Sequence, residues 1–191
     1  MILSEAGTGP VLPPLAAYKE HLRLSHGFGD EGGEDALLSG YLAAAVAVIE
    51  RRTGRALGRR AFSLAVSRLG PEGCVVLPVG PVETISDATL EAGGAATPLD
   101  VSGWSVAPGS TRQAVSRSGA PLPSVPPGGV LRLGFDAGLA ADWDGVPADL
   151  AQAVMMLAAD FHARRGTERD GDEGLPAPVI ALTAPWRPAR L

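Results

Sequence analysis

The pattern of apolar and polar positions is clearest between Glu34 and Leu57, where it has the period of an α-helix. Acidic residues begin this segment, and Arg51 and Arg52 near its end suit the negative pole of a helix dipole. Gly54 can adopt the left-handed conformation that closes a last helical turn. The pattern therefore predicts one long amphipathic helix. Its predicted buried face consists of Leu37, Leu38, Tyr41, Leu42, Ala45, Val48 and Ile49.

Two more segments have helical spacing. A short helix is predicted to begin at Pro13, with apolar positions at Leu15, Tyr18 and Leu22. A second long helix is predicted from Pro147 to Arg165, with an apolar face made of Leu150, Val154, Met155, Leu157, Ala158 and Phe161. We expect the two long helices to pack against each other. Residues 1–12, before the first helix, are predicted to be a flexible leader.

Between the long helices the period changes to that of a strand. Phe62, Leu64 and Val66 alternate with small and polar residues, the signature of a half-buried strand. Residues 107–129 are so rich in Pro, Gly and Ser that either a mobile loop or an extended hairpin is predicted. Strands at such short spacing are expected to pair antiparallel. The other predicted strands, with a glycine turn at Gly93–Gly94, are 74–77, 82–90, 104–106 and 130–135.

These elements predict an α+β fold in three parts. Residues 13–57 and 147–167 are expected to form a helical body, with an antiparallel β-rich block, 58–140, inserted between them. Residues 168–191 are expected to form a loop and an extended C-terminal arm with no fold of its own. The final sequence, LPAPVIALTAPWRPARL, contains too many prolines for a long helix and is too apolar for a solvated tail. The arm is therefore predicted to contact another protein.

Composition narrows the choice of partners. The chain has 191 residues, 46% of them hydrophobic and 19% charged, as in ordinary globular domains. Its net charge of −5 gives no overall electrostatic attraction for nucleic acid. Cys74 is the single cysteine, which suits a reducing cytoplasm and excludes an internal disulfide. No signal peptide or membrane span is recognisable, so we expect a soluble protein made in the bacterial cytoplasm, without a membrane partner.

Residue patterns for catalysis are absent. The chain has no nucleophile elbow, phosphate-binding loop or paired-cysteine metal motif. His21, His26 and His162 are scattered, and the acidic run 170–173 lacks the ligand spacing of a calcium loop. Cys74 is interpreted as a small core residue. We therefore predict no enzymatic activity and no catalytic, cofactor-binding or metal-binding residues.

Five arginines cluster at the end of the long helix and just beyond it. One explanation is that they complement the helix dipole and are solvated. The other is that they contact an acidic partner or a neighbouring subunit through their forked guanidinium groups. Binding of duplex DNA is the weakest option, because the chain is acidic. The cluster consists of Arg51, Arg52, Arg55, Arg59 and Arg60.

Several short segments, taken together and in order, resemble the head–tail connector (adaptor) proteins of long-tailed bacteriophages. Related particles include prophages and gene transfer agents. Each motif is weak alone, but the ordered set covers nearly the whole chain. The loops 25–33 and 107–129 are local departures from the pattern. The matching segments are Lys19–Leu24, Glu34–Leu38, Ile49–Leu57, Leu77–Val82, Phe135–Gly138, Val146–Leu150 and Leu182–Arg187.

The resemblance implies a structural role in the neck of a virion or phage-like particle. Such connectors form a ring of about twelve copies beneath the portal protein. They extend the DNA channel, through which DNA passes without sequence-specific binding, and they present a surface to a tail-side neck protein. The C-terminal segment reaches the portal, so the candidate portal contacts are Val179, Ile180, Leu182, Pro185, Trp186 and Arg187. The candidate contacts between subunits are Arg51, Arg52 and Arg55.

Two alternatives remain open from the sequence. The protein could be another neck component, such as a stopper or a tail terminator. It could also belong to a different class, a small cytoplasmic enzyme or ligand-binding protein whose site uses main-chain groups. Ring formation on a portal separates the leading hypothesis from the second alternative.

Overall fold

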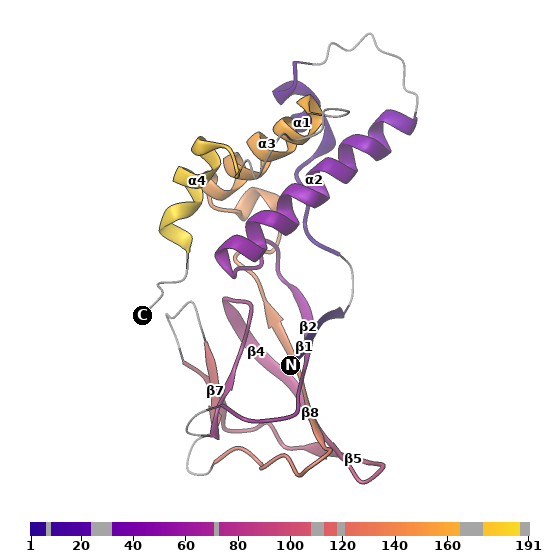
Figure 1. The fold of residues 1–191 in the computed structure, drawn as a ribbon, viewed down its shortest axis with the longest axis vertical. Coiled ribbons are helices and arrows are strands. Elements are labelled where there is room, and N and C mark those ends of the chain that lie inside the picture. The colour runs from indigo at the N-terminus through magenta and orange to yellow at the C-terminus, as the bar shows by residue number, and fades with distance from the viewer. Residues whose placement is uncertain are drawn as a thin grey trace.

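A computed structural model describes residues 1–6, 9–23, 32–70, 73–107, 113–117, 121–164 and 174–187. The helices gather at one end of an elongated molecule and the strands at the other (Figure 1). This arrangement confirms the predicted α+β class. The division of the chain into the three predicted parts remains a prediction.

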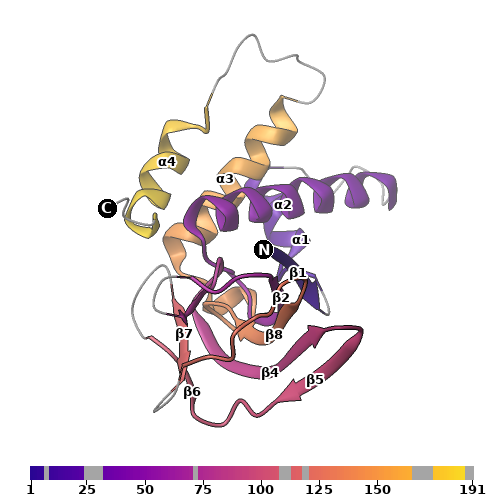
Figure 2. The ribbon, with the colours of Figure 1, turned by 60° about the horizontal axis from the view of Figure 1, so that its bottom comes forward.

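The helical end is a layer in which α3 lies between α2 and α4, and both views agree on this order (Figures 1 and 2). Side chains from α1, α2, α3 and α4 share one hydrophobic cluster, which includes Tyr18, Leu42, Leu150 and Val179. The expected packing of the two long helices is thus confirmed. The helical elements are α1 (Leu15–His21), α2 (Gly32–Thr53), η2 (Trp143–Gly145), α3 (Ala148–Ala163), α4 (Ala177–Thr183) and η3 (Ala184–Trp186).

The β end contains two antiparallel sheets. The larger has the order β1-β2-β8-β4-β5, and the smaller has the order β3-β7-β6. Because β8 lies between β2 and β4, the strand that follows α2 and the strand that precedes α3 are neighbours. The strands are β1 (Ile2–Ala6), β2 (Arg60–Val66), β3 (Val75–Val76), β4 (Val82–Ala92), β5 (Ala95–Leu99), β6 (Trp104–Val106), β7 (Ala114–Arg117) and β8 (Val130–Ala137).

Local patterns placed most of these elements correctly. Strand β2 alternates buried and half-buried residues along its whole length, as its period of two predicted. Phe62 of β2 stacks on Phe135 of β8 with ring centroids 5.5 Å apart. Gly54 has a φ of 67° directly after α2. Gly93 and Gly94 have φ values of 59° and 80° in the turn between β4 and β5, where such backbone angles favour glycine.

Two predictions for the chain ends were wrong. Part of the expected flexible leader forms β1, which pairs antiparallel with β2 from Ile2 to Ala6 at the edge of the sheet. All five residues of β1 are exposed, so pairing through the backbone left no apolar pattern to detect. The expected extended arm contains α4 and η3 and packs on α3. Pro176 and Pro178 are compatible with this short helix because they lie at its start, where N–H groups have no helical partner.

Three smaller expectations also need correction or completion. Leu37, predicted on the buried face of α2, is 45% exposed. Cys74 is half-buried just before β3 and is therefore not a core residue. Strand β7 pairs with β6, which favours the hairpin interpretation for that part of 107–129. His26 and the acidic run 170–173 lie outside the described residues, as does most of the loop 25–33.

Candidate assembly site at the helical junction

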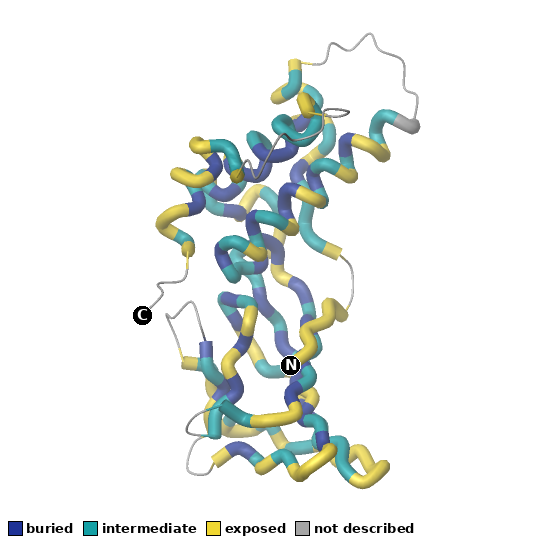
Figure 3. Tube along the Cα trace, viewed as in Figure 1, coloured by how far each residue is buried: buried dark blue, intermediate teal, exposed yellow. Residues whose placement is uncertain are grey.

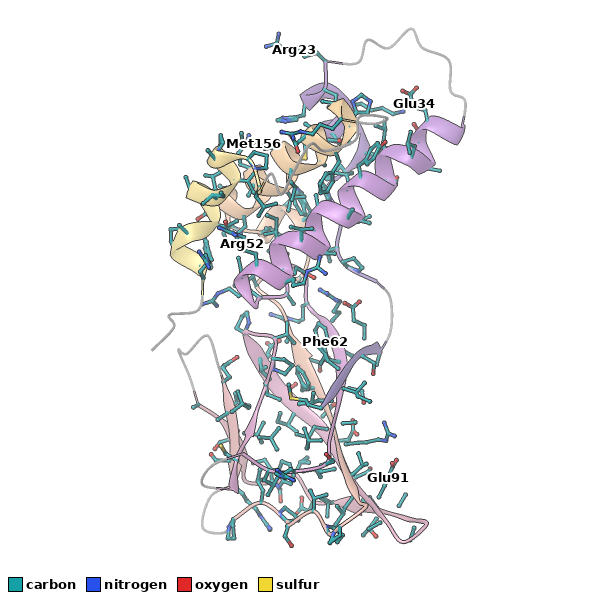
Figure 4. All side chains as sticks on the ribbon, viewed as in Figure 1. Arg23, Glu34, Arg52, Phe62, Glu91 and Met156 are labelled. Atoms are coloured by element: carbon teal, nitrogen blue, oxygen red, sulfur yellow. The ribbon has the colours of Figure 1, made fainter. Side chains whose placement is uncertain are left out.

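The ends of three helices meet on the side of the helical layer that faces the sheets. The last turns of α2, the first turn of α3 and the end of the α4–η3 segment contribute side chains there. Arg52 lies at the end of α2 that is closer to α4 (Figure 4). We call this place the helical junction and define it by Arg52, Arg55, Asp149, Thr183 and Trp186.

Trp186 is the centre of the junction. Its indole Nε1 donates a hydrogen bond to Oδ2 of Asp149 at 2.6 Å. The guanidinium carbon of Arg55 lies 5.3 Å from the centroid of the same ring, within the range of a cation–π interaction. The hydrogen bond engages the indole nitrogen, and the cation lies over the ring of this half-buried side chain. Together they anchor the C-terminal segment to α3 and to the residues that directly follow α2.

Arg52 forms a second link to the same segment. Its Nε donates a hydrogen bond to Oγ1 of Thr183 at 2.8 Å. The Thr183 hydroxyl in turn donates to the backbone oxygen of Val179 at 2.7 Å, one turn earlier in α4. Thr183 is fully buried, so these bonds satisfy a polar group that would otherwise be costly to bury.

The junction unites residues that the sequence analysis assigned to two different interfaces. Arg52 and Arg55 were predicted to contact neighbouring subunits, yet they bind Thr183 and Trp186 of their own chain. Arg51, the third arginine predicted there, is exposed. Asp149 and Thr183 were not singled out, and only the position of Asp149 in the first turn of a predicted helix offered a signal.

The six predicted portal contacts fall into two groups. Val179 is 0% exposed, and Leu182 and Trp186 are half-buried against the helical core. These three side chains pack against the helical core, and Val179 has no exposed surface left for a partner. The exposed members of the set are Ile180, Pro185 and Arg187.

Arg60 has a different role from the other arginines. Its guanidinium binds both carboxylate oxygens of Glu50, at 2.9 and 2.7 Å, and Oε1 of Glu5 at 2.8 Å. Burial lowers the pKa of Arg60, but the hydrogen bonds and charges of Glu50 and Glu5 outweigh this effect and raise it above its ordinary value. Neither explanation offered for the arginine cluster fits Arg60. It is a buried cation whose ion pairs link α2, β1 and β2.

An open groove lies beside the end of α2. It has a volume of about 660 Å³, and its walls come from the end of β2, the segment after it and β3. Its lining is mainly apolar, with Val66, Leu69, Val75 and Val76, and it also includes Arg51 and Arg68. Most of the lining lies within residues 66–78, and the tertiary fold adds Met1, Arg51 and Gly54 to it.

Other kinds of site have little support in the described part of the chain. No group of three or more His, Cys, Asp or Glu residues there could hold a metal ion. None of the helices described is long and apolar enough to cross a membrane. The polar contacts of the junction join side chains of one chain and hold its C-terminal segment on the helical layer.

Comparison with solved structures supplies the context for this geometry. A chain from the neck of an empty gene transfer agent (GTA) particle, computed with C6 symmetry, matches with a TM-score of 0.86 and 41% identity over 100% of this chain and 97% of that chain. A chain from the virion of a native GTA particle matches with a TM-score of 0.83 and 40% identity over the same shares. A chain from the neck of a native GTA particle, computed with C12 symmetry, has a TM-score of 0.81, 37% identity and the same coverage.

The chain belongs to the head–tail connector family. The resemblance predicted from the short ordered motifs is thereby confirmed. The likeness to these chains of GTA particles extends over the full length of the protein and therefore includes the helical junction. No protein-family model and no curated protein matches the chain.

Proposed function

We propose that this connector is the structural adaptor that joins capsid to tail in the neck of a GTA-like or phage-like particle. The observation that carries the proposal is the full-length match, at 37–41% identity, to chains of GTA particles. In this role the protein is made in the bacterial cytoplasm and has no enzymatic activity. It binds the portal protein on one side and a tail-side neck protein on the other.

In the proposed particle the adaptor forms a ring of about twelve copies. Two of the similar structures are particle necks computed with C6 and C12 symmetry, which is the symmetry expected of such rings. The ring extends the DNA channel below the portal. The net charge of −5 suits a conduit through which DNA passes without sequence-specific binding.

The helical junction suggests how the portal contact is built. Val179, Leu182 and Trp186 anchor the C-terminal segment on the body, as their burial indicates. The exposed Pro185 and Arg187 then lie at the end of a fixed support. We propose that these two residues and the chain that follows them contact the portal, with Arg187 binding a carboxylate of the partner.

Portal binding tests this proposal directly. A truncation after Trp186 removes Arg187 and the chain that follows it, while keeping Pro185, α4 and η3 on the body. We expect this variant and Arg187→Glu to lose at least tenfold in affinity for the portal from the same particle, measured by co-sedimentation and interferometry. Arg117→Glu, which changes an exposed arginine on β7, is the matched control and should bind like the wild type.

The outcomes separate the parts of the proposal. Unchanged binding by the truncated chain would refute the role of the C-terminal end. If the wild-type protein does not bind the portal but binds an assembled adaptor ring or a tail tube, it is a stopper or a tail terminator instead. Stabilisation by a metabolite, with no ring on any partner, would favour the ligand-binding alternative.

A further inference from the structure

Helix α2 exposes a face that is unusual for a helix in water. From Ala36 to Ile49 it has no charged residue. Five of these fourteen residues are exposed, and Leu37 among them is 45% exposed. A helix that is apolar on all sides is normally covered on all sides. We define the α2 outer face as the exposed residues Ala36, Leu37, Gly40, Ala44 and Ala47.

Among the described residues, no neighbour requires glycine at position 40. Gly40 lies in the middle of a 22-residue helix, where glycine is less favourable than alanine. Its φ is not positive, and a Cβ added at this position would meet no atom within 4 Å. The fold therefore does not require glycine here. A close approach by another polypeptide would require it, because only glycine lets a neighbouring backbone or large side chain come so near.

Helix α4 exposes a second uncharged face. From Leu175 to Trp186 the chain again has no charged residue. Val179 and Thr183 turn inward, while Ile180 is 40% exposed. We define the α4 outer face as Ala177, Ile180, Ala181 and Ala184. One face thus offers a large branched side chain, and the other offers a shallow surface of small residues.

The two faces lie on opposite flanks of the same layer. Helix α3 separates α2 from α4, and exposed segments follow the outer sides of both helices (Figure 3). Neighbouring copies in a cyclic ring meet through two different patches, one on each flank of the subunit. A chain with complementary uncharged patches on its two flanks has the geometry that such a contact needs.

We propose that the α2 outer face of one copy packs against the α4 outer face of the next copy, with Ile180 seated over Gly40 and Ala44. The second copy is the occupant that fits best, because this chain itself carries the complementary surface. The inference deepens the proposed function and rests on its ring. It assigns Ile180 to the contact between subunits and leaves Pro185 and Arg187 for the portal.

Cross-linking between copies tests the pairing. In a Cys74→Ser background, the double variant Gly40→Cys with Ile180→Cys is assembled into particles and treated with a short bis-maleimide. We expect a ladder of covalent multimers that extends to the closed ring. Either single variant should give no covalent multimers on a denaturing gel. In a head-to-tail contact, the same position on two neighbouring copies is too far apart to be cross-linked. The double variant Ala95→Cys with Ile180→Cys, which uses the exposed first residue of β5, should also give no ladder.

Each outcome of the cross-linking experiment refutes a different part of the proposal. Rings seen by electron microscopy without a ladder from the Gly40–Ile180 pair would refute the pairing and leave the proposed function intact. A ladder from the Ile180→Cys single variant would also refute it, because the contact would then be symmetric. Wild-type protein that forms no ring on its portal would overturn the ring itself, and with it the proposed function.

A second variant keeps the test independent of cysteine chemistry. Gly40→Gln places a good helix former in open space, so the melting temperature should rise by about 1–4 °C. The same change should reduce ring yield at least tenfold, because the longer side chain blocks the close approach. Ala163→Gln at the exposed end of α3 is the matched control and should leave ring yield unchanged. Normal rings from Gly40→Gln would refute the proposal.

Discussion

The large β-sheet and the helical layer of this protein differ in the charge of their outer surfaces. The exposed side of the large sheet carries ion pairs, such as Arg59 with Glu83 at 2.8 Å and Arg132 with Glu91 at 2.7 Å. Glu91 lies far from the helices, near the end of the β part (Figure 4). The outer faces of α2 and α4 carry no charge at all. The charged side of the sheet is suited to water, although Ile2 and Leu3 of β1 are 72% and 39% exposed, whereas the uncharged helical faces are suited to another protein.

The interiors of the two regions are also separate. Each has its own hydrophobic cluster, one built from helices and one from strands. Between them, the carboxylates of Glu50 and Glu5 surround the buried guanidinium of Arg60. Glu50 Oε1 additionally accepts a hydrogen bond from the backbone N–H of Leu57 at 2.7 Å. This polar cluster, together with main-chain hydrogen bonds that join residues 54–59 to Gly80 and to residues 139–140, links the helices to the sheet.

The largest predicted effect comes from removing the guanidinium group of Arg60. Arg60→Ala leaves Glu50 buried without its cation, and removal of one partner from a buried pair costs about 3–5 kcal/mol. We expect the free energy of unfolding, measured by urea denaturation, to fall by that amount. Arg59→Ala is the matched control, because its exposed pair with Glu83 should contribute less than about 1 kcal/mol. Equal losses of unfolding free energy in the two variants would contradict the proposed role of Arg60 as a buried link between the helices and the sheet.

A smaller effect is predicted at the helical junction. Asp149→Ala leaves the half-buried Nε1 of Trp186 without its acceptor, which should cost about 1–3 kcal/mol. Asp149→Asn keeps an acceptor oxygen and should recover part of the loss. Tryptophan fluorescence during urea denaturation reports both values. If the alanine variant were as stable as the wild type, Asp149 would not anchor the C-terminal segment.

The smallest predicted effect lies within the helical core. The hydroxyl of Tyr18 is buried and has no hydrogen-bond partner among the described residues. Tyr18→Phe should therefore change stability at neutral pH by less than about 1 kcal/mol. Burial, with a further contribution from Tyr41, raises the pKa of Tyr18 to about 12 from 10.0.

This shift has a defined sign. A pKa raised by folding contributes stability that is present below pH 10 and is lost as pH rises towards 12. Melting curves at pH 9, 10 and 11 should therefore show a smaller alkaline loss for Tyr18→Phe than for the wild type. Parallel losses in the two proteins would show that Tyr18 ionises as easily in the folded state as in the unfolded one.

The sequence by itself determined the features that depend on neighbouring residues. Helix α2 and its end at Gly54 followed from spacing of three and four, and β2 followed from spacing of two. The glycine pair between β4 and β5 followed from its preference for positive φ. These features are local, because backbone geometry and the alternation of side chains act over a few residues.

Only the tertiary structure decided which distant surfaces meet. Strand β8 lies between β2 and β4, Arg52 binds Thr183 across 131 positions, and Leu37 lies on the open side of its helix. Spacing placed six of the seven predicted residues of the α2 inner face correctly, but it put Leu37 on the wrong side. Only the packing of α3 and α4 against α2 decides how much of the uncharged segment stays open, because that contact is made by residues distant in sequence. This is the physical reason that the candidate subunit surface is defined by the structure and not by the sequence.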